Sequence, residues 1–423
     1  MESIVISGER KLSGTIYSSG SKNASLPIIA SAILVKKLEL YNIPNLADVN
    51  SMLNLLESLG IKNKYSFENN KKKLLLESSE EISSEANYDL VRKMRASFLV
   101  LGPLLAKNGY AKVSLPGGCA IGLRPVDLHI FAMKKLGADI ELKDGYVISK
   151  SKKKGLYGNK ISFPTVSVGA TENAIMAAVL AKGETLIKNA AKEPEVQDLC
   201  NCLVEMGAKI TGIGTSSLII QGVTSLNQIS YSIIADRIEV CSYIIAAAIT
   251  QSNLNIKNVD HRHIKEFLVV MEKMRLDFKV LSNSIKVKES GKLKPIKLKT
   301  SAYPGFPTDM QAQIITLACL CSGESEVEES IFENRFMHIP ELNRLGANIS
   351  INGNKAIIKG NTNFIGAEVM ATDLRASVSL ILAGLAAKGE TKVNRVYHLD
   401  RGYEKIDKKL SGCGAKIYRK QNG

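Results

Sequence analysis

The chain has no tryptophan, and only 5% of its 423 residues are aromatic. Proteins that bind single-stranded nucleic acid stack bases on aromatic side chains, so this scarcity argues against that class, although the net charge is +15. The longest apolar runs, such as residues 380–387, are much shorter than the roughly 20 residues of a membrane-spanning helix. We therefore expect neither nucleic-acid binding nor membrane insertion.

Signatures of cofactors and of secretion are also missing. Seven cysteines are present, but pairs such as Cys200 and Cys202 do not have the spacing of zinc ligands. No Gly-x-Gly-x-x-Gly follows a predicted strand, and the small-residue turn at 166–171 lacks the lysine of a nucleotide P-loop. The first residues are acidic and strand-like, unlike a signal peptide. We expect no metal, no organic cofactor and a cytoplasmic protein with reduced thiols.

What the sequence does contain is a sixfold repeat. A glycine follows the end of an amphipathic helix in five copies, and an arginine replaces it in a sixth: Gly60, Gly137, Gly207, Arg275, Gly346 and Gly414. The successive spacings are 77, 70, 68, 71 and 68 residues. Glycine is favoured there because the residue after a helix often adopts the left-handed conformation. We therefore expect six similar units of alternating helices and strands, with a local departure at Arg275.

Six repeats in a chain of this length predict two domains of three repeats each. The polar stretch 224–232 is the expected crossover between them. The first domain is predicted to end near residue 232, and the second to include residues 233–423.

A glycine-rich loop from Pro116 to Pro125 contains Cys119 and, five residues later, Arg124. Glycines let the backbone approach a ligand closely, and a thiol near a fixed positive charge ionises more readily. The loop therefore has the composition of an anion site with a reactive sulfur. The alternative is that Cys119 is only a small apolar side chain in a turn.

Other candidates lie where apolar helices are predicted to begin. Lys22 lies in the stretch 21–24 that precedes such a helix, where the helix dipole already favours an anion. The alternative is that this lysine is only solvated. Asp309 has two interpretations: a helix cap together with Thr308, or a carboxylate that acts as a general base.

Three arginines, Arg95, Arg237 and Arg375, each begin the apolar helix of a repeat. Their repetition favours a shared structural task, such as capping or pairing with the preceding acid. Arg401 is expected at the start of a different helix in the last repeat, which makes it the better candidate for an anion ligand.

Several phrases occur together in the order known from one family. They cover residues 20–27, 94–97, 115–129, 167–171, 306–313, 332–338, 372–376 and 398–404. With these phrases the chain resembles the UDP-N-acetylglucosamine 1-carboxyvinyltransferase family of enolpyruvyl transferases over nearly its whole length. Two alternatives remain. One is the related 3-phosphoshikimate 1-carboxyvinyltransferases, which lack the cysteine loop, and the other is a basic RNA-interacting repeat protein.

The resemblance implies an α/β fold: a two-domain inside-out α/β barrel of six βαβαββ repeats, three in each domain. It also implies that the first domain spans residues 20–232 and that residues 1–19 join residues 233–423 in the second domain. The implied reaction transfers enolpyruvyl from phosphoenolpyruvate to the 3′-hydroxyl of UDP-N-acetylglucosamine and releases phosphate, by addition and elimination. This reaction is the first committed step of peptidoglycan synthesis. The implied partners are these two small molecules, and a monomer is favoured.

The resemblance also assigns roles to residues. Cys119 is the acid, can add covalently to phosphoenolpyruvate, and is the residue that fosfomycin would alkylate. Asp309 would take the proton of the 3′-hydroxyl. Lys22, Arg124 and Arg401 would hold phosphoenolpyruvate.

The remaining substrate-binding residues that the resemblance implies are Asn23, Arg95, Pro125, Val126, Asp127, Leu128, Ser167, Val168, Gly169, Ile331 and Arg375. Arg375 is expected on the phosphate side, and Arg237 is expected to be structural. Thr165 stands where relatives often carry a lysine, so one contact to the nucleotide is expected to be missing or to come from elsewhere. Closure over the substrates, with the Cys119 loop as a lid, is also expected.

Overall fold

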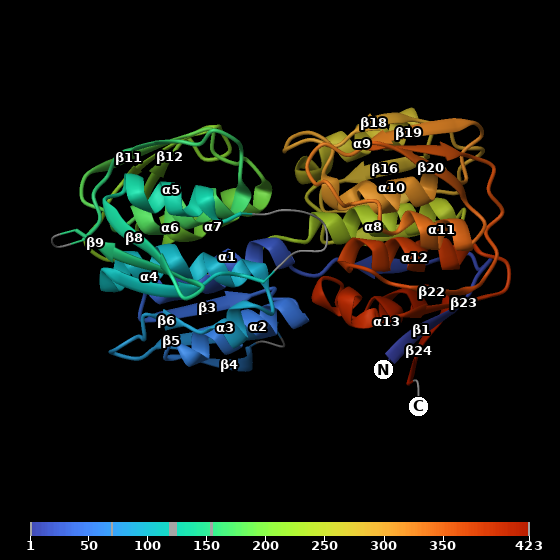
Figure 1. The fold of residues 1–423 in the computed structure, drawn as a ribbon. Coiled ribbons are helices and arrows are strands. Elements are labelled where there is room, and N and C mark those ends of the chain that lie inside the picture. The colour runs from blue at the N-terminus through green and yellow to red at the C-terminus, as the bar shows by residue number, and fades with distance from the viewer. Residues whose placement is uncertain (1, 69–70, 118–124, 153–154, 422–423) are drawn as a thin grey trace. The chain divides into compact units, whose positions relative to one another are not determined.

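The computed structural model describes residues 2–68, 71–117, 125–152 and 155–421. Contacts divide this part of the chain into two units (Figure 1). The N-terminal unit contains the described residues from Gly20 to Ile234. The C-terminal unit contains residues 2–19 and 235–421.

The N-terminal unit contains twelve strands among its described residues. They are β3 (Lys37–Tyr41), β4 (Ile61–Glu68), β5 (Lys71–Ser78), β6 (Glu85–Ala86), β7 (Tyr110–Ser114), β8 (Ala138–Lys143), β9 (Tyr146–Ser151), β10 (Lys160–Ser162), β11 (Glu184–Lys188), β12 (Lys209–Thr211), β13 (Ser217–Gln221) and β14 (Ile229–Ser232). Its helices are α1 (Lys22–Ser31), α2 (Ala47–Ser58), α3 (Tyr88–Val91), α4 (Leu101–Asn108), α5 (Asp127–Lys135), α6 (Val168–Ala178) and α7 (Pro194–Glu205), with the 3-10 helices η1 (Ala32–Leu34) and η2 (Arg95–Val100).

The C-terminal unit also has twelve strands among its described residues. Its strands are β1 (Glu2–Ser7), β2 (Thr15–Tyr17), β15 (Leu254–Lys257), β16 (Phe278–Leu281), β17 (Ser284–Val287), β18 (Lys297–Lys299), β19 (Glu324–Glu328), β20 (Asn348–Asn352), β21 (Lys355–Lys359), β22 (Glu368–Met370), β23 (Glu390–Asn394) and β24 (Lys416–Gln421). Its helices are α8 (Arg237–Ile249), α9 (Lys265–Lys273), α10 (Gln311–Ala318), α11 (Ile339–Arg344), α12 (Leu374–Ala386) and α13 (Ile406–Ser411), with the 3-10 helices η3 (His261–Ile264), η4 (Thr308–Met310) and η5 (Val396–Arg401).

The strands form six four-stranded sheets in the described part of the chain, three in each unit. Each sheet follows one plan, in which an edge strand pairs in parallel with the next strand and the other two pairings are antiparallel. The order β10-β11-β13-β12 is an example. In the C-terminal unit, β2 supplies the parallel edge beside β15, and β1 lies between β23 and β24. The repeat inferred from the sequence is therefore present as six copies of one sheet.

Three helices form the interior of each unit: α1, α4 and α6 in the N-terminal unit, and α8, α10 and α12 in the C-terminal unit. Helix α10 is buried along its whole length, and α12 is buried from Arg375 to Leu385. Their small apolar residues allow burial on all sides, as the even distribution of hydrophobic residues predicts. Helices lie inside and sheets outside, so each unit has the inside-out α/β arrangement (Figure 1).

The predicted helix caps are confirmed. The glycines Gly60, Gly137, Gly207, Gly346 and Gly414 have φ angles of 98°, 90°, 100°, 97° and 100°. Arg275 has a φ of 66°, so it adopts the left-handed conformation without the freedom of glycine. The fourth repeat therefore keeps the shape of the cap with a residue that fits it poorly.

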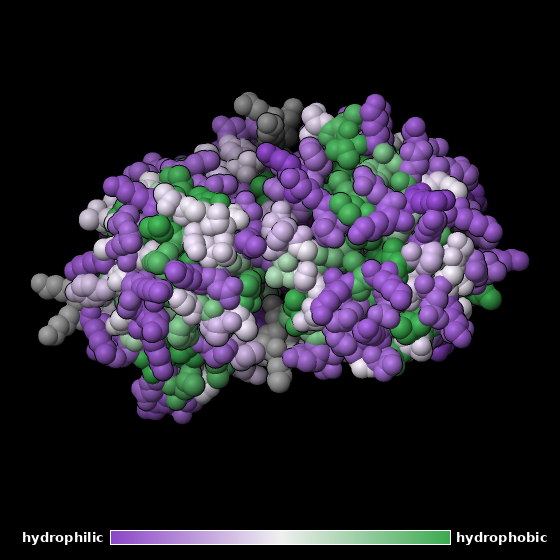
Figure 2. All heavy atoms as spheres, turned by 90° about the horizontal axis from the view of Figure 1, so that it is seen from above, coloured by the Kyte–Doolittle hydropathy of each residue, from purple (hydrophilic) through white to green (hydrophobic). Residues whose placement is uncertain are grey.

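Hydrophilic residues cover most of the face that Figure 2 shows, and hydrophobic residues appear there as separate areas. Among the helices of the described residues, none combines the length and the apolar character that a membrane crossing requires.

Candidate active site

The most strongly charged group of predicted residues is in the C-terminal unit, around Asp309 at the start of α10. Its Oδ1 accepts a hydrogen bond of 2.7 Å from Nη2 of Arg335, and its Oδ2 accepts one of 2.7 Å from Nη2 of Arg375. Both arginine side chains are only 6% exposed. One carboxylate therefore lies between two nearly buried guanidinium groups.

This arrangement fixes the charge state of Asp309. Burial alone would raise the pKa of its carboxyl group, but Arg375 and Arg335 lower that pKa well below the ordinary 3.8. Asp309 is therefore ionised, and with two guanidiniums beside it the group has an excess of positive charge. The alternative interpretation of Asp309 as a helix cap is wrong, because its carboxylate pairs with the arginines and makes no cap to η4.

Arg335 was not among the predicted site residues, although it belongs to the phrase at 332–338. A short chain of hydrogen bonds holds it in place: its Nη1 donates to Thr308 Oγ1 at 2.9 Å, and Thr308 Oγ1 donates to Glu329 Oε2 at 2.8 Å. The other oxygen of Glu329 accepts from the amide of Ile331 at 2.8 Å. The predicted Ile331 is thus on the same braced loop, and its side chain is 40% exposed.

Arg375 comes from the first turn of α12. The preceding acid, Asp373, caps this helix by accepting from the amides of Arg375 and Ala376 at 2.8 and 3.1 Å. The idea that the arginine pairs with the acid before it is therefore wrong for Arg375, because Asp373 is used by the backbone and the guanidinium reaches Asp309. In α8, Asp236 caps in the same way, and the guanidinium of Arg237 lies 5.8 Å from the ring centroid of Tyr303.

Arg401 is the last residue of η5 rather than the first residue of a helix, which corrects its predicted position. It still contributes positive charge. Burial and the nearby Arg401 both lower the pKa of His398. Asp400, the residue before Arg401, accepts hydrogen bonds of 2.9 and 2.5 Å from Arg419.

In the N-terminal unit, Lys22 is the first residue of α1, at the helix N-terminus as predicted, and Ser21 caps that helix. The ammonium group of Lys22 lies 2.8 Å from Asp48 Oδ2, and the two side chains are 13% and 4% exposed. Asn23 follows in the same turn and is half-buried. Lys22 is therefore held at a helix N-terminus, a place that favours an anion.

The predicted residues Ser167, Val168 and Gly169 form the first turn of α6, which Ser167 caps. His129 packs directly against this turn. A Cβ atom added to Gly169 would lie 3.2 Å from His129 Cε1 and 3.4 Å from Nε2. Gly169 is therefore required for the close approach of the histidine ring.

Asn173, one turn further along α6, fixes the orientation of His129. Its Oδ1 accepts from the amide of Gly102 at 2.6 Å, so its Nδ2 is the donor to Phe98 O and to His129 Nδ1, both at 3.0 Å. His129 Nδ1 is thus an acceptor, and the ring proton belongs to Nε2. Neither Asn173 nor His129 had a predicted role, although both lie in or beside the phrases that carry the resemblance.

The other predicted residues of this unit lie near helix starts. Arg95 is the first residue of η2 and is half-buried, while Pro125 and Val126 lead into α5, which begins at Asp127 and Leu128. Cys119 and Arg124 lie outside the described residues.

The cysteines that the structure does describe are all buried: Cys200, Cys202, Cys241, Cys319, Cys321 and Cys413. Burial raises the pKa of both Cys200 and Cys319 to about 12. These thiols therefore lack the ionisation that reactivity requires.

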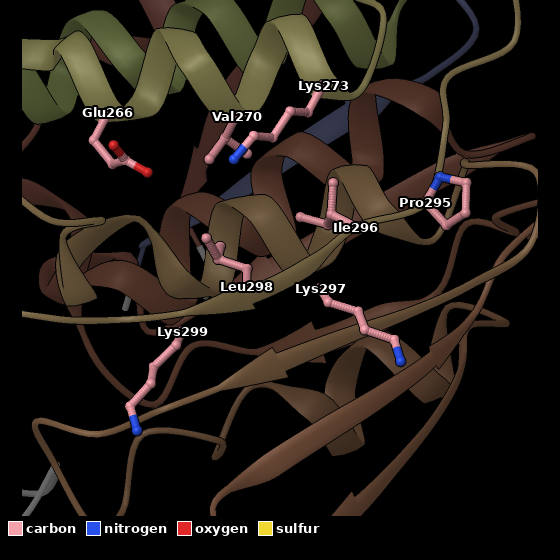
Figure 3. Close-up of a pocket in the computed structure, with 8 residues that line it drawn as sticks. All are labelled: Glu266, Val270, Lys273, Pro295, Ile296, Lys297, Leu298 and Lys299. Carbon is pink, nitrogen blue, oxygen red and sulfur yellow. The ribbon is translucent and has the colours of Figure 1, made fainter.

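A hollow of about 330 Å³ lies in the C-terminal unit, between α9 and the start of β18. Figure 3 shows Lys273, Lys297 and Lys299 around it, with Glu266 on the helix. None of the predicted site residues that the structure describes lines this hollow. Lys299 is paired with Glu328 at 2.7 Å, so surface lysines rather than buried ligands border it.

Comparison with known proteins identifies the family of the chain. The sequence profile of the family described as EPSP synthase (3-phosphoshikimate 1-carboxyvinyltransferase) matches residues 6–410. The chain is 53% identical over 420 residues to UDP-N-acetylglucosamine 1-carboxyvinyltransferase of Pelagibacter ubique, covering 99% of this chain and 100% of the relative. It is 51% identical to the protein of that name from Rickettsia felis, with the same coverage, and 52% identical to that of Zymomonas mobilis, with 99% of each chain covered.

Solved structures show the same fold. The enolpyruvyl transferase NikO of Streptomyces tendae superposes with a TM-score of 0.87 at 23% identity, covering 100% of this chain and 99% of NikO. An EPSP synthase from Acinetobacter baumannii superposes with a TM-score of 0.77 at 16% identity, and both chains are covered completely. The chain therefore belongs to the EPSP synthase family and, within it, to the UDP-N-acetylglucosamine 1-carboxyvinyltransferases, a group of transferases.

Proposed function

We propose that this enzyme transfers the enolpyruvyl group of phosphoenolpyruvate to the 3′-hydroxyl of UDP-N-acetylglucosamine and releases phosphate, and that it serves peptidoglycan synthesis. The observation that carries the proposal is the ionised Asp309 between two buried guanidiniums, in a chain about half identical to enzymes of this name. We also propose that it acts in the cytoplasm as a monomer, without a metal or an organic cofactor.

The addition step requires an acid and a base. Cys119 gives its proton to C3 of phosphoenolpyruvate, the 3′-oxygen of the sugar forms a bond to C2, and the hydroxyl proton goes to Asp309. In the elimination step, C3 returns a proton to the thiolate of Cys119, the bond between C2 and the phosphate oxygen breaks, and Asp309 gives its proton to the leaving phosphate. The enol ether and inorganic phosphate result, so atoms and charges balance.

The charged residues bind and stabilise the anionic substrate. Lys22, Arg124 and Arg401 offset the charges of phosphoenolpyruvate, which carries both a carboxylate and a phosphate, as the family resemblance implies. To these we add Arg335, which with Arg375 presents two guanidiniums to a carboxylate. We assign this pair to the carboxylate of phosphoenolpyruvate, which replaces the phosphate side expected for Arg375, because the pair already holds a carboxylate in Asp309.

The low pKa of Asp309 in this state makes it a weak base. An incoming substrate carboxylate competes for the same two guanidiniums. When it takes their hydrogen bonds, Asp309 loses the interactions that lower its pKa, and its basicity rises. Binding of phosphoenolpyruvate thus prepares the residue that receives the hydroxyl proton.

The nucleotide sugar binds chiefly to the N-terminal unit in this proposal. Its contacts are Asn23, Arg95, Pro125 to Leu128 and the helix start at Ser167 to Gly169, with Ile331 from the C-terminal unit. Amides at the first turn of α6 are suited to an anionic group.

The proposal is tested by mixing the protein with phosphoenolpyruvate and UDP-N-acetylglucosamine and following the release of phosphate. We expect release that depends on both substrates. Shikimate 3-phosphate serves as the comparison acceptor, because the family profile also covers the enzymes that use it. Phosphate release with that acceptor in place of UDP-N-acetylglucosamine would overturn the assignment.

The role of Cys119 has a separate test, in which fosfomycin is added and the modified residue is located by mass spectrometry. We expect a single adduct at Cys119 and loss of activity. The buried cysteines with raised pKa values provide the internal control. An adduct at any of them instead of Cys119 would contradict the assigned role.

A further inference from the structure

Tyr403 connects the three core helices of the C-terminal unit near the Asp309 group. It follows η5 and is only 1% exposed. Its hydroxyl oxygen lies 2.7 Å from Ser242 Oγ on α8, 3.4 Å from Gln313 Nε2 on α10 and 3.4 Å from Arg375 Nη1 on α12. One buried hydroxyl therefore contacts all three helices, α10 and α12 in their first turns and α8 in its second.

The direction of these hydrogen bonds follows from their donors. The hydroxyl of Ser242 donates its single proton to Ile238 O at 2.8 Å. Tyr403 must then donate to Ser242, which leaves its own oxygen free to accept from Arg375 and Gln313. The result is a directed chain from the guanidinium of Arg375 through Tyr403 and Ser242 to the backbone of α8.

The same residues also contact Asp309. Gln313 Nε2 donates to the backbone oxygen of Asp309 at 3.0 Å, and Nη2 of Arg375 donates to its carboxylate at 2.7 Å. The guanidinium of Arg375 lies 5.7 Å from the ring centroid of Tyr403, so the ring limits its movement as well. Tyr403 thus contacts Gln313 of α10 and Arg375 of α12, and both of these residues donate hydrogen bonds to Asp309.

We propose that Tyr403 is a positioning residue whose hydroxyl sets the orientation of Arg375 toward the carboxylate of phosphoenolpyruvate. This inference rests on the proposed function and deepens it. A long arginine side chain has many rotamers. When the substrate replaces Asp309 as hydrogen-bond partner of Arg375, the Tyr403 hydroxyl remains as a fixed acceptor and limits the rotamers that Arg375 can adopt. Arg375 then keeps its direction throughout the reaction.

The test is Tyr403→Phe, which keeps the ring and removes only the hydroxyl. We expect the KM for phosphoenolpyruvate to rise about tenfold, because Arg375 loses an anchor that orients it. The KM for UDP-N-acetylglucosamine should change less than about twofold, because that ligand has its contacts chiefly in the other unit.

The matched control is Tyr243→Phe. Tyr243 is equally buried, lies on α8 beside Ser242, and donates its hydroxyl to Glu239 instead of to the site. We expect this variant to lose stability in urea unfolding without a change in the KM for phosphoenolpyruvate. Equal rises of that KM in both variants would show a general loss of structure and would overturn the positioning role.

The chain of hydrogen bonds is also tested without substrate, through the variant Ser242→Ala. Tyr403→Phe and Ser242→Ala should be non-additive in urea unfolding, because both remove the same hydrogen bond. Additive effects would overturn the chain. If the unaltered protein released no phosphate, the proposed function would fail while this unfolding test still decided whether the chain exists. An active unaltered protein with an unchanged KM in Tyr403→Phe would overturn the positioning role alone.

Discussion

Two aspartates, one in each unit, have opposite pKa shifts. Asp309 in the C-terminal unit lies between two guanidiniums, and its pKa is lowered well below 3.8. Asp198 on α7 in the N-terminal unit is 2% exposed and accepts from the Tyr231 hydroxyl at 2.7 Å and from the Ile234 amide at 3.3 Å. Burial raises its pKa to about 6 in spite of these two hydrogen bonds. Neutral donors therefore do not replace the charge partners that keep a buried carboxylate ionised.

The comparison also distinguishes an aspartate with a structural role, Asp198, from one with a proposed role in the reaction, Asp309. Charge partners hold Asp309 ionised, where an anionic substrate can exchange with it. Asp198 accepts a hydrogen bond from the amide of Ile234, at the end of its unit, and its pKa is raised because this position is buried. A perturbed pKa alone would have marked both residues, so the guanidiniums are the feature that distinguishes the site.

The largest expected effect is that of Asp309→Asn on activity. Asparagine keeps the size and one acceptor but cannot take the hydroxyl proton, so kcat should fall by roughly a thousandfold. Steady-state phosphate release measures this loss. Asp198→Asn is the matched control, with the same change at the other aspartate, and should retain nearly full activity. Similar activity in the two variants would remove the functional distinction between these residues.

The next prediction concerns the pH dependence of stability. For Asp198 the folded pKa of about 6 lies above the ordinary 3.8, so its contribution is most favourable below pH 3.8 and is lost as the pH rises through 6. This difference corresponds to about 3 kcal/mol at neutral pH. Asp198→Asn should therefore gain about that much free energy of unfolding, relative to the unaltered protein, between pH 4 and pH 8.

Asp309 should show the opposite sign. Its folded pKa is lowered, so its stabilising contribution is present above pH 3.8 and is lost as the pH falls toward the lower folded value. The free energy of unfolding of both variants is measured in urea at pH values below and above 3.8. The same sign of pH dependence for Asp198→Asn and Asp309→Asn would contradict the assigned charge environments.

A smaller effect is expected at the first turn of α6. In Gly169→Ala the added methyl group would press on the ring of His129, and overpacking of this kind costs about 1–3 kcal/mol. We expect the KM for UDP-N-acetylglucosamine to rise roughly tenfold, with a smaller change for phosphoenolpyruvate. Gly291→Ala is the control, since an added Cβ there meets open space. A change confined to phosphoenolpyruvate would reverse the division of substrates between the two units.

The smallest effect is expected from Arg275→Gly, which restores the glycine found in the other five repeats. Removing a left-handed non-glycine residue should stabilise the C-terminal unit by about 0.5–1 kcal/mol, less the added entropy of the unfolded chain. Thermal unfolding measures the gain. The reverse change in the sixth repeat, Gly414→Ala, should destabilise, because Gly414 has a φ of 100°. If both variants changed the thermal stability in the same direction, the caps of the fourth and sixth repeats would not be equivalent.

Local features could be predicted from the sequence, and long-range contacts could not. The cap glycines and the helix start near Lys22 depend on neighbouring residues, so spacing and residue type were sufficient. The pairing of Asp309 with Arg335 and Arg375 joins residues 26 and 66 positions apart, and no periodicity encodes it. Arg335 was missed for that reason, although its phrase had been recognised. The contacts of Asn173 were missed because an asparagine inside an apolar helix gives no sign of its partner.

The position of β1 has a consequence for the order in which the protein folds during synthesis. This strand lies between β23 and β24, whose residues are made almost 400 positions later. All strands and helices of the N-terminal unit, in contrast, lie between residues 22 and 232 and can pair as soon as they leave the ribosome. Strand β1 must therefore wait, unpaired, until β23 is made, and its sheet is complete only when β24 has followed. Its sheet is the last of the six to form, although its synthesis begins first.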